Sequence, residues 1–217
     1  MATSSQSAVI FLHGSGDTGA GIRSYITSLG LAKRLADKGV HLEYPTAPKR
    51  PYTIAHGELV NVWFDRLEMA PSSPEMTESI DVSIKRIDAL VDKLVAQGVD
   101  RARIAVGGFS QGGGLTIQLM CRLAKEKKSL AGFFALSSYA NDDSKVLKQT
   151  LYPSAPFFMA HGEADGFVLP AWGRSTKDRL ESLGFQVTWR TYKALAHELR
   201  GDELEDLYDF LAQVLAL

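Results

Sequence analysis

This chain of 217 residues is poor in cysteine, with Cys121 as its single thiol. One thiol excludes a disulfide within the chain and fits a reducing compartment, so we expect a cytoplasmic protein. Cys121 falls among apolar residues of a predicted helix, where a small buried side chain is a better interpretation than a second nucleophile. Small folds held together by disulfides are therefore excluded.

The sequence also has almost no net charge and no long apolar run. A formal charge of -1 at pH 7 provides no basic surface for nucleic acid or an anionic membrane. No apolar stretch is long enough to span a bilayer, so we expect no stable membrane insertion. Residues 1–7 are polar and lack the apolar core of a signal peptide, and we expect them to be flexible.

Sequence patterns typical of metal and nucleotide sites are missing as well. The chain has neither paired cysteines nor a His-Glu-x-x-His segment. The first glycine-rich segment, His13 to Asp17, lacks the Gly-x-Gly-x-x-Gly pattern and the lysine of a phosphate-binding loop. We therefore expect no metal and no cofactor.

The sequence does contain a regular alternation of short apolar runs and amphipathic stretches. Its 45% hydrophobic content suits one domain with a substantial core, which we expect to span residues 1–217. The alternation predicts an α/β fold with a mostly parallel central sheet, helices on both faces and no large cap domain. The predicted strands are 8–12, 40–44, 103–107, 130–136, 155–160 and 186–192. The predicted helices are 24–38, 78–97, 113–125, 170–183 and 202–215, with proline-rich loops at 45–51 and 70–74.

A serine lies between two glycines at the joint between a predicted strand and a predicted helix, in the segment Gly108-Phe109-Ser110-Gln111-Gly112. This pattern in this context predicts a nucleophile elbow, in which the serine adopts a strained backbone conformation. Only glycine fits where the strand and the helix close around it. We therefore predict that the Ser110 hydroxyl projects above the carboxyl end of the sheet.

Further polar residues follow other predicted strands, where parallel sheets form their sites. Asp165 and His197 come after the strands at 155–160 and 186–192. The order serine, acid, histidine is that of the α/β-hydrolases. We predict that His197 is the base that activates Ser110 and that Asp165 orients His197. Asp202 is a candidate cap of the following helix.

Alternatives exist for two of these assignments. Glu163 competes with Asp165 for the acid position, although a place in the solvent is the better interpretation for Glu163. His13 and His161 also follow strands, but each precedes a glycine in a turn, which favours a structural imidazole bonded to the loop backbone. A tetrahedral intermediate needs preorganised donors, and position predicts the backbone N–H groups of Ser15 and Gln111.

With these residues placed, the chain resembles the phospholipase/carboxylesterase family of small α/β-hydrolases, which includes acyl-protein thioesterases. The resemblance spans residues 11 to 197 and rests on matching segments at 11–17, 44–48, 63–65, 107–113, 161–165 and His197. Details such as Ser15 and the segment Asn61-Val62-Trp63-Phe64-Asp65-Arg66 are most similar to the lysophospholipase-like branch. The resemblance implies Ser110, Asp165 and His197 as catalytic residues and the Ser15 and Gln111 amides as the oxyanion hole.

The resemblance also implies substrates. Members of the family hydrolyse acyl esters and thioesters, including S-acylated proteins and lysophospholipids, and this branch is associated with a shallow site and short to medium acyl chains. We expect a monomer or weak dimer. Trp63 and Trp172 are candidate lining residues of the acyl pocket, with a core position as the alternative for Trp63. For Met69 and Met76 a structural role is favoured. Three competing hypotheses stay open: a long-chain protein depalmitoylase, a hydrolase of peptides or lactones with the same three catalytic residues, and a non-catalytic ligand-binding protein on the same fold.

Overall fold

The computed structural model describes residues 6–217 as one six-stranded parallel sheet flanked by helices, with a small hairpin beside it. The sheet has the order β2-β1-β5-β6-β7-β8, and β3 and β4 form the antiparallel hairpin. The strands are β1 (Ser7–Leu12), β2 (Val40–Glu43), β3 (Lys49–Tyr52), β4 (Glu58–Asn61), β5 (Ile104–Phe109), β6 (Gly132–Leu136), β7 (Phe157–Gly162) and β8 (Val187–Tyr192). The α-helices are α1 (Gly19–Ser28), α2 (Leu31–Ala36), α3 (Thr77–Ala96), α4 (Gln111–Lys125), α5 (Pro170–Ser182) and α6 (Gly201–Leu215).

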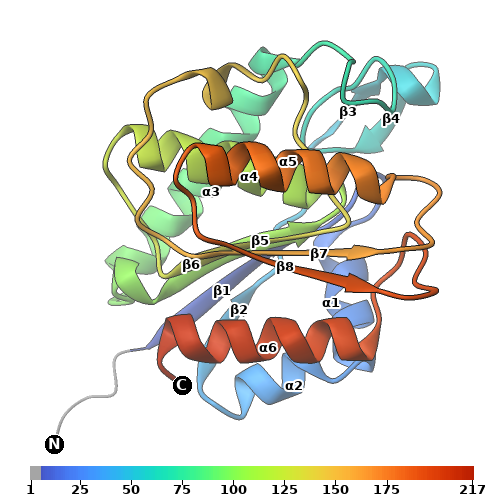
Figure 1. The fold of residues 1–217 in the computed structure, drawn as a ribbon. Helices are drawn as coiled ribbons and strands as arrows, with labels where there is room; N and C mark the ends of the chain where they lie inside the picture. Colours follow the sequence, from blue (N-terminus) through green and yellow to red (C-terminus); the bar gives the residue numbers. More distant parts are fainter. Residues whose placement is uncertain (1–5) are drawn as a thin grey trace, which may run out of the picture.

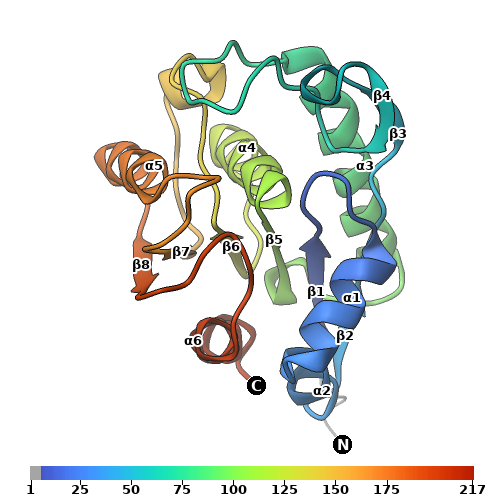
Figure 2. The same cartoon turned by 90° about the vertical axis from the view of Figure 1, so that its right-hand side faces the viewer.

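Three layers build the molecule, with the sheet in the middle (Figures 1 and 2). Helices α3, α4 and α5 cover one face and bury apolar side chains such as Ile84, Leu115 and Leu180 against it. Helices α1, α2 and α6 cover the other face, with a second core that includes Ile22 and Leu207. The α/β fold class expected from the alternating pattern is confirmed, because the central strands β1, β5, β6 and β7 bury both faces under amphipathic helices.

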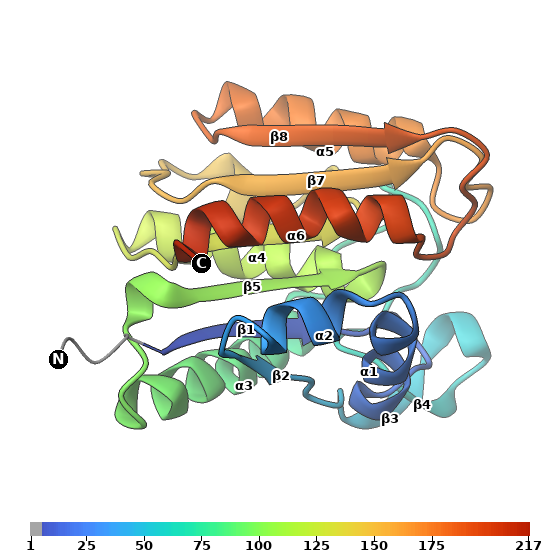
Figure 3. The same cartoon turned by 90° about the horizontal axis from the view of Figure 1, so that it is seen from below.

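All six strands of the sheet point the same way, so their carboxyl ends meet along one edge (Figure 3). The hairpin β3–β4 lies beyond this edge, beside the turn that follows β1 (Figure 3). The Gly16 amide donates to the Asn61 carbonyl at 2.9 Å and ties that turn to the hairpin. The topology therefore brings the residues after β1, β5, β7 and β8 to one side of the molecule.

Three expectations about local structure need correction. The helix expected over 24–38 is two helices, because Gly30 adopts φ 88° and interrupts the helical conformation between α1 and α2. The loop expected over 45–51 ends in strand β3, which pairs with β4 from Lys49↔Asn61 to Tyr52↔Glu58. Of the segment 1–7 expected to be flexible, residues 1–5 lie outside the described residues, and Ser7 is already the buried first residue of β1.

Within residues 6–217, none of the helices combines the length and the apolar character that a bilayer-spanning segment requires.

Helix α6 begins with an unusual carboxyl group. Glu203 lies in its first turn and is fully buried, and this burial raises the pKa of the Glu203 carboxyl to about 8. A carboxyl whose pKa is higher in the folded than in the unfolded state favours folding most at low pH. That contribution is lost as the pH rises from the pKa of the carboxyl in the unfolded chain to its pKa in the folded protein, between about 4 and 8.

We expect Glu203→Gln to raise the melting temperature at pH 9 by at least about 3 °C, because the amide has no charge to desolvate. The gain should shrink towards pH 5, where the wild-type carboxyl is itself neutral. Melting curves of both proteins between pH 5 and 9 measure this difference, with the exposed neighbour Glu205→Gln as the control. An equal increase in melting temperature at pH 5 and at pH 9 would contradict the expectation.

Candidate active site

Ser110 lies at the sharp turn between β5 and α4 and has the backbone conformation expected of a nucleophile elbow. Its φ of 52° and ψ of -119° are rare for a residue with a side chain. The Ser110 amide donates to the Leu136 carbonyl at 2.8 Å, which fixes the turn to the end of β6. The strain expected at this serine is therefore confirmed.

The two flanking glycines are required by close backbone contacts. A Cβ atom at Gly108 would lie 2.5 Å from the Leu12 carbonyl oxygen, and one at Gly112 would lie 2.4 Å from the same oxygen. Both distances are far below van der Waals contact, so the glycines let β1 pass directly beside the elbow.

We expect Gly108→Ala to lower the free energy of unfolding by about 1–3 kcal/mol, the usual result of forcing an atom into a packed interior. Urea or thermal unfolding measures the change. Gly201→Ala is the matched control, because a Cβ there meets no atom within 4 Å and Gly201 already opens helix α6. A Gly108→Ala protein as stable as the control would show that β1 can move away from the elbow.

Three side chains from different loops form a continuous hydrogen-bonded chain. The His197 Nδ1 donates to the Asp165 carboxylate at 2.7 Å, and the His197 Nε2 lies 3.0 Å from the Ser110 Oγ. Asp165 follows β7, and His197 lies in the loop between β8 and α6. The structure thus brings together the three residues that sequence order predicted as a set.

The Asp165 carboxylate is held by several donors. Its Oδ1 accepts the amides of Phe167 at 2.9 Å and Val168 at 2.8 Å. Burial alone would raise the pKa of this carboxyl, but hydrogen bonds from His161, His197 and the Val168 amide outweigh it and hold the pKa well below its usual range. Asp165 is therefore a fixed anion facing His197.

The imidazole of His197 is packed between two aromatic rings. The ring of Phe109, the last residue of β5, lies 4.8 Å from it, and the ring of Phe167 lies 5.0 Å away. Phe167 is itself half exposed, so it covers the histidine on the solvent side. This packing limits the ring to orientations that keep both hydrogen bonds.

The other two strand-end histidines bond to loop backbone, as expected. His13 is fully buried, with Nδ1 2.6 Å from the Gly14 carbonyl and Nε2 accepting the Ala47 amide at 3.0 Å. The His161 Nε2 donates to the Val168 carbonyl at 2.8 Å and lies 3.5 Å from Asp165. His161 therefore also contacts the carboxylate of Asp165, and the sequence pattern did not reveal this contact.

Gln111 connects the elbow to the loop that follows β4. Its side chain accepts the Trp63 amide at 2.7 Å and donates to the Phe64 carbonyl at 2.9 Å. The Trp63 indole in turn donates to the His13 carbonyl at 2.8 Å. The Gln111 backbone amide, at the first position of α4, has no acceptor within its helix and is free to bind a negative charge beside Ser110.

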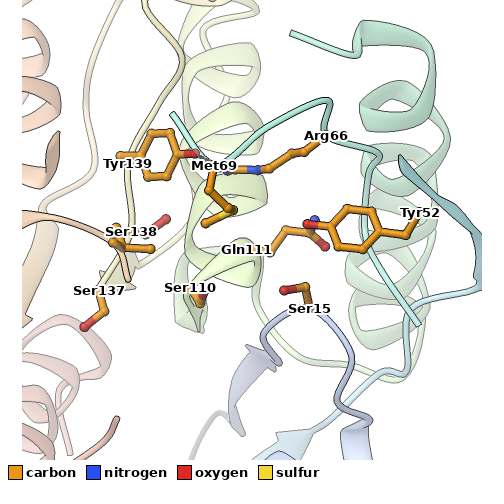
Figure 4. A pocket seen from close by; sticks show the side chains of 10 residues that line it. Ser15, Tyr52, Arg66, Met69, Ser110, Gln111, Ser137, Ser138 and Tyr139 are labelled. Carbon is orange, nitrogen blue, oxygen red and sulfur yellow. Dashed lines mark hydrogen bonds between the residues drawn. The ribbon is translucent and has the colours of Figure 1, made fainter. Parts of the chain in front are cut away.

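A small pocket opens directly over Ser110 (Figure 4). The pocket is small, and part of its empty space of about 230 Å³ is open to solvent. Its wall comes from the loops after β1, β4, β6 and β7, from the end of β3 and from the turn between β5 and α4. It consists of Ser15, Tyr52, Arg66, Met69, Ser110, Gln111, Ser137, Ser138, Tyr139 and Val168. Both residues predicted to supply oxyanion amides, Ser15 and Gln111, therefore lie on this pocket.

Several expectations about the surroundings of the site were wrong. Trp63 takes the core position given as its alternative, since it is fully buried beneath the turn after β1 and does not line the pocket. Trp172 does not line it either but packs edge-on against Tyr139, with ring centres 5.1 Å apart. Met69 lines the pocket rather than being purely structural, whereas Met76 precedes α3 and is not part of that wall. Asp202 is not the cap of α6, because the helix already begins at Gly201.

Glu163 and Cys121 are placed as expected. Glu163 is exposed and accepts the Thr191 hydroxyl at 2.8 Å, away from His197. Cys121 is fully buried, and its burial raises the pKa of the thiol to about 12, so it is not a nucleophile at neutral pH. Among residues 6–217, no three histidine, cysteine or carboxylate side chains gather with the geometry of a metal site.

Comparison with known proteins identifies the family and the fold. The sequence profile of the phospholipase/carboxylesterase family matches residues 2–215. Lysophospholipase-like protein 1 of Mus musculus is 41% identical over 207 residues, covering 94% of this chain and 85% of that protein. Acyl-protein thioesterase 1 of Neurospora crassa is 35% identical over 216 residues, covering 95% and 86%. The crystal structure of Arabidopsis thaliana SOBER1 superposes with a TM-score of 0.85 at 26% identity, covering 97% of this chain and 99% of that one.

The sheet topology and these similarities show that the protein is an enzyme of the α/β-hydrolase fold. The profile match spans nearly the whole chain, and so the chain belongs to the phospholipase/carboxylesterase family. Its curated relatives include acyl-protein thioesterases and a probable carboxylesterase of Oryza sativa, 31% identical over 218 residues. The chain is therefore a hydrolase of the esterase or thioesterase type, and the resemblance inferred from its motifs is confirmed.

Proposed function

We propose that this protein hydrolyses carboxylic esters and thioesters through an acyl-enzyme formed on Ser110. His197 acts as the general base and acid, and Asp165 orients His197 and stabilises its charged form. The observation that carries this proposal is the unbroken chain of hydrogen bonds from Asp165 through His197 to a serine on a strained elbow.

In the first half of the reaction, the Ser110 Oγ attacks the carbonyl carbon while its proton passes to the His197 Nε2. The carbonyl oxygen becomes an oxyanion, which the backbone N–H groups of Ser15 and Gln111 bind. The oxyanion then collapses, the bond to the alcohol or thiol breaks, and His197 returns the proton to that leaving group. Ser110 is left acylated.

In the second half, water takes the place of the leaving group. His197 removes a proton from the water, whose oxygen attacks the acyl carbon and forms a second oxyanion in the same position. Collapse releases the carboxylic acid and returns the proton to Ser110. The carboxylate of Asp165 stays ionised throughout, because its hydrogen bonds hold its pKa low.

The substrates that we propose carry short to medium acyl chains on an ester or thioester, including S-acylated proteins. Relatives named as acyl-protein thioesterases support the thioester part. The small pocket over Ser110, which is walled by the bulky side chains of Tyr52, Met69 and Tyr139, supports the short chain. We also propose that the chain works as one domain in the cytoplasm, as a monomer or weak dimer.

Labelling with a fluorophosphonate tests the mechanism, because the reagent reacts with activated serines alone. We expect covalent labelling of the wild type and none of Ser110→Ala. The control variant Ser175→Ala, at an exposed position of α5, should label like the wild type. An unlabelled wild type that still binds an acyl ester would favour the alternative of a non-catalytic ligand-binding protein.

We expect the specificity constant to be highest for nitrophenyl esters between acetyl and octanoyl and to fall for palmitoyl. Each buried methylene contributes about 0.8 kcal/mol, but a filled pocket leaves further carbons in water. The series is measured below micelle-forming concentrations. Met69→Ala should move the optimum to longer chains, because Met69 lines the pocket, whereas Met76→Ala should not. A wild-type profile climbing steadily to sixteen carbons would identify a long-chain depalmitoylase instead.

A further inference from the structure

Arg66 is a buried arginine on the wall of the pocket that contains Ser110 (Figure 4). It follows β4 in the loop that Gln111 anchors, and only 5% of its surface is exposed. Its guanidinium donates to the Tyr139 hydroxyl and lies 4.3 Å from the centre of the Tyr139 ring. The guanidinium is therefore held in a defined position by aromatic groups rather than by acids.

No carboxylate among residues 6–217 pairs with this guanidinium. The arginines in ion pairs are others, namely Arg101, Arg122, Arg179, Arg190 and Arg200. The neighbouring acid Asp65 instead accepts the amide and the hydroxyl of Thr53, at 2.8 Å and 2.7 Å. The Arg66 Nε has no hydrogen-bond partner within the described part of the chain.

An unpaired buried charge is strongly unfavourable and normally attracts an anion. Burial lowers the pKa of Arg66 to about 10, so the guanidinium still carries its charge at neutral pH. The pocket wall offers more donors, since the buried hydroxyls of Ser137 and Ser138 lack partners among residues 6–217. A buried guanidinium without an acidic partner is a good receptor for a carboxylate.

The position of His197 indicates which part of the substrate enters this pocket. His197 has to reach the leaving group in order to protonate it. It contacts Ser110 but is not part of the pocket wall. The leaving group therefore lies on the His197 side of Ser110, and the acyl chain extends into the pocket towards Arg66.

We propose that Arg66 binds a carboxylate at the far end of a short acyl chain, which makes esters and thioesters of short dicarboxylic acids the preferred substrates. This proposal rests on the proposed function, because it places the acyl chain relative to Ser110. Water and the ester yield the free dicarboxylic acid and an alcohol or thiol. The distal carboxylate is not consumed in the reaction and forms no covalent bond. Its role is to anchor and align the chain.

The test compares monoethyl glutarate with ethyl pentanoate, which have acyl chains of equal length with and without a distal carboxylate. We expect the wild type to have the higher kcat/KM for monoethyl glutarate. Arg66→Met should lower the ratio of the two kcat/KM values by about tenfold to a hundredfold, the range for a charged hydrogen bond. Arg66→Lys should restore part of it. Arg174→Met, which removes the same charge from the exposed face of α5, should keep the wild-type ratio.

A second measurement covers the case in which Arg66→Met does not fold. Glutarate should inhibit ethyl pentanoate hydrolysis by the wild type competitively and more strongly than pentanamide does. A third substrate, carboxymethyl pentanoate, carries the charge on the leaving group instead. An Arg66-dependent preference for this substrate would overturn the proposal, as would a wild type that prefers ethyl pentanoate. Fluorophosphonate labelling of Ser110 in the same samples separates these failures from a failure of the proposed mechanism.

Discussion

Ser110→Ala is expected to lower kcat for ester hydrolysis by about a million-fold while the melting temperature stays close to that of the wild type. Losses of this order follow removal of the nucleophile from a serine hydrolase, because the remaining groups act only on the attack of that oxygen. The Ser110 Oγ lies 3.0 Å from the His197 Nε2, and in the proposed mechanism it is the atom that forms the bond to the acyl carbon.

Stability should change little because alanine retains the Cβ and the same strained backbone. Alanine at φ 52° is no worse placed than serine, and the Ser110 amide keeps its bond to Leu136. Steady-state rates of the purified variant measure the loss, with Ser175→Ala as the control and a melting curve for each protein. Residual activity of more than a few per cent that no contaminant explains would contradict the proposed mechanism.

Much of the fold follows from periodicity. The strands around β1, β5 and β7 are short apolar runs, and the long helix α3 shows its buried stripe of isoleucines at helical spacing. The break at Gly30 was missed because apolar residues continue at helical spacing on both sides of it. The hairpin β3–β4 was missed because its strands are short and partly exposed, and β3 contains Pro51.

The part of the site that lies at the carboxyl ends of the strands could be predicted from the sequence. Ser110, Asp165 and His197 each follow a strand, and parallel strands bring their carboxyl ends together. Arg66 could not be identified in this way, since charged side chains are rarely buried and an arginine after an aspartate is typical of a surface. Its burial is decided by the path of the loop after β4, which Gln111 and Trp63 fix through contacts over long sequence distances. The segment from Asn61 to Arg66, distinctive within the family, was the available signal.

Asp165→Asn is expected to lower kcat by about ten-thousand-fold, less than the loss of Ser110. The acid transfers no proton, but it fixes the imidazole with Nδ1 donating and Nε2 facing Ser110. An asparagine side chain carries an amide donor, and the Phe167 and Val168 amides already occupy the Oδ1 position. The new NH₂ group therefore faces His197 and favours the tautomer in which Nε2 holds the proton and cannot accept another.

Glu163→Gln is the matched control for this loss of activity, because it changes a carboxylate to an amide two residues away, at an exposed position. It should keep wild-type kcat, since Glu163 bonds to Thr191 and not to His197. The two variants are compared by steady-state kinetics between pH 6 and 9. Part of the lost activity of Asp165→Asn should return at high pH, where hydroxide can compensate for the missing base. Wild-type activity in Asp165→Asn combined with a loss in Glu163→Gln would assign the orienting acid to Glu163, and would require the loop after β7 to rearrange when substrate binds.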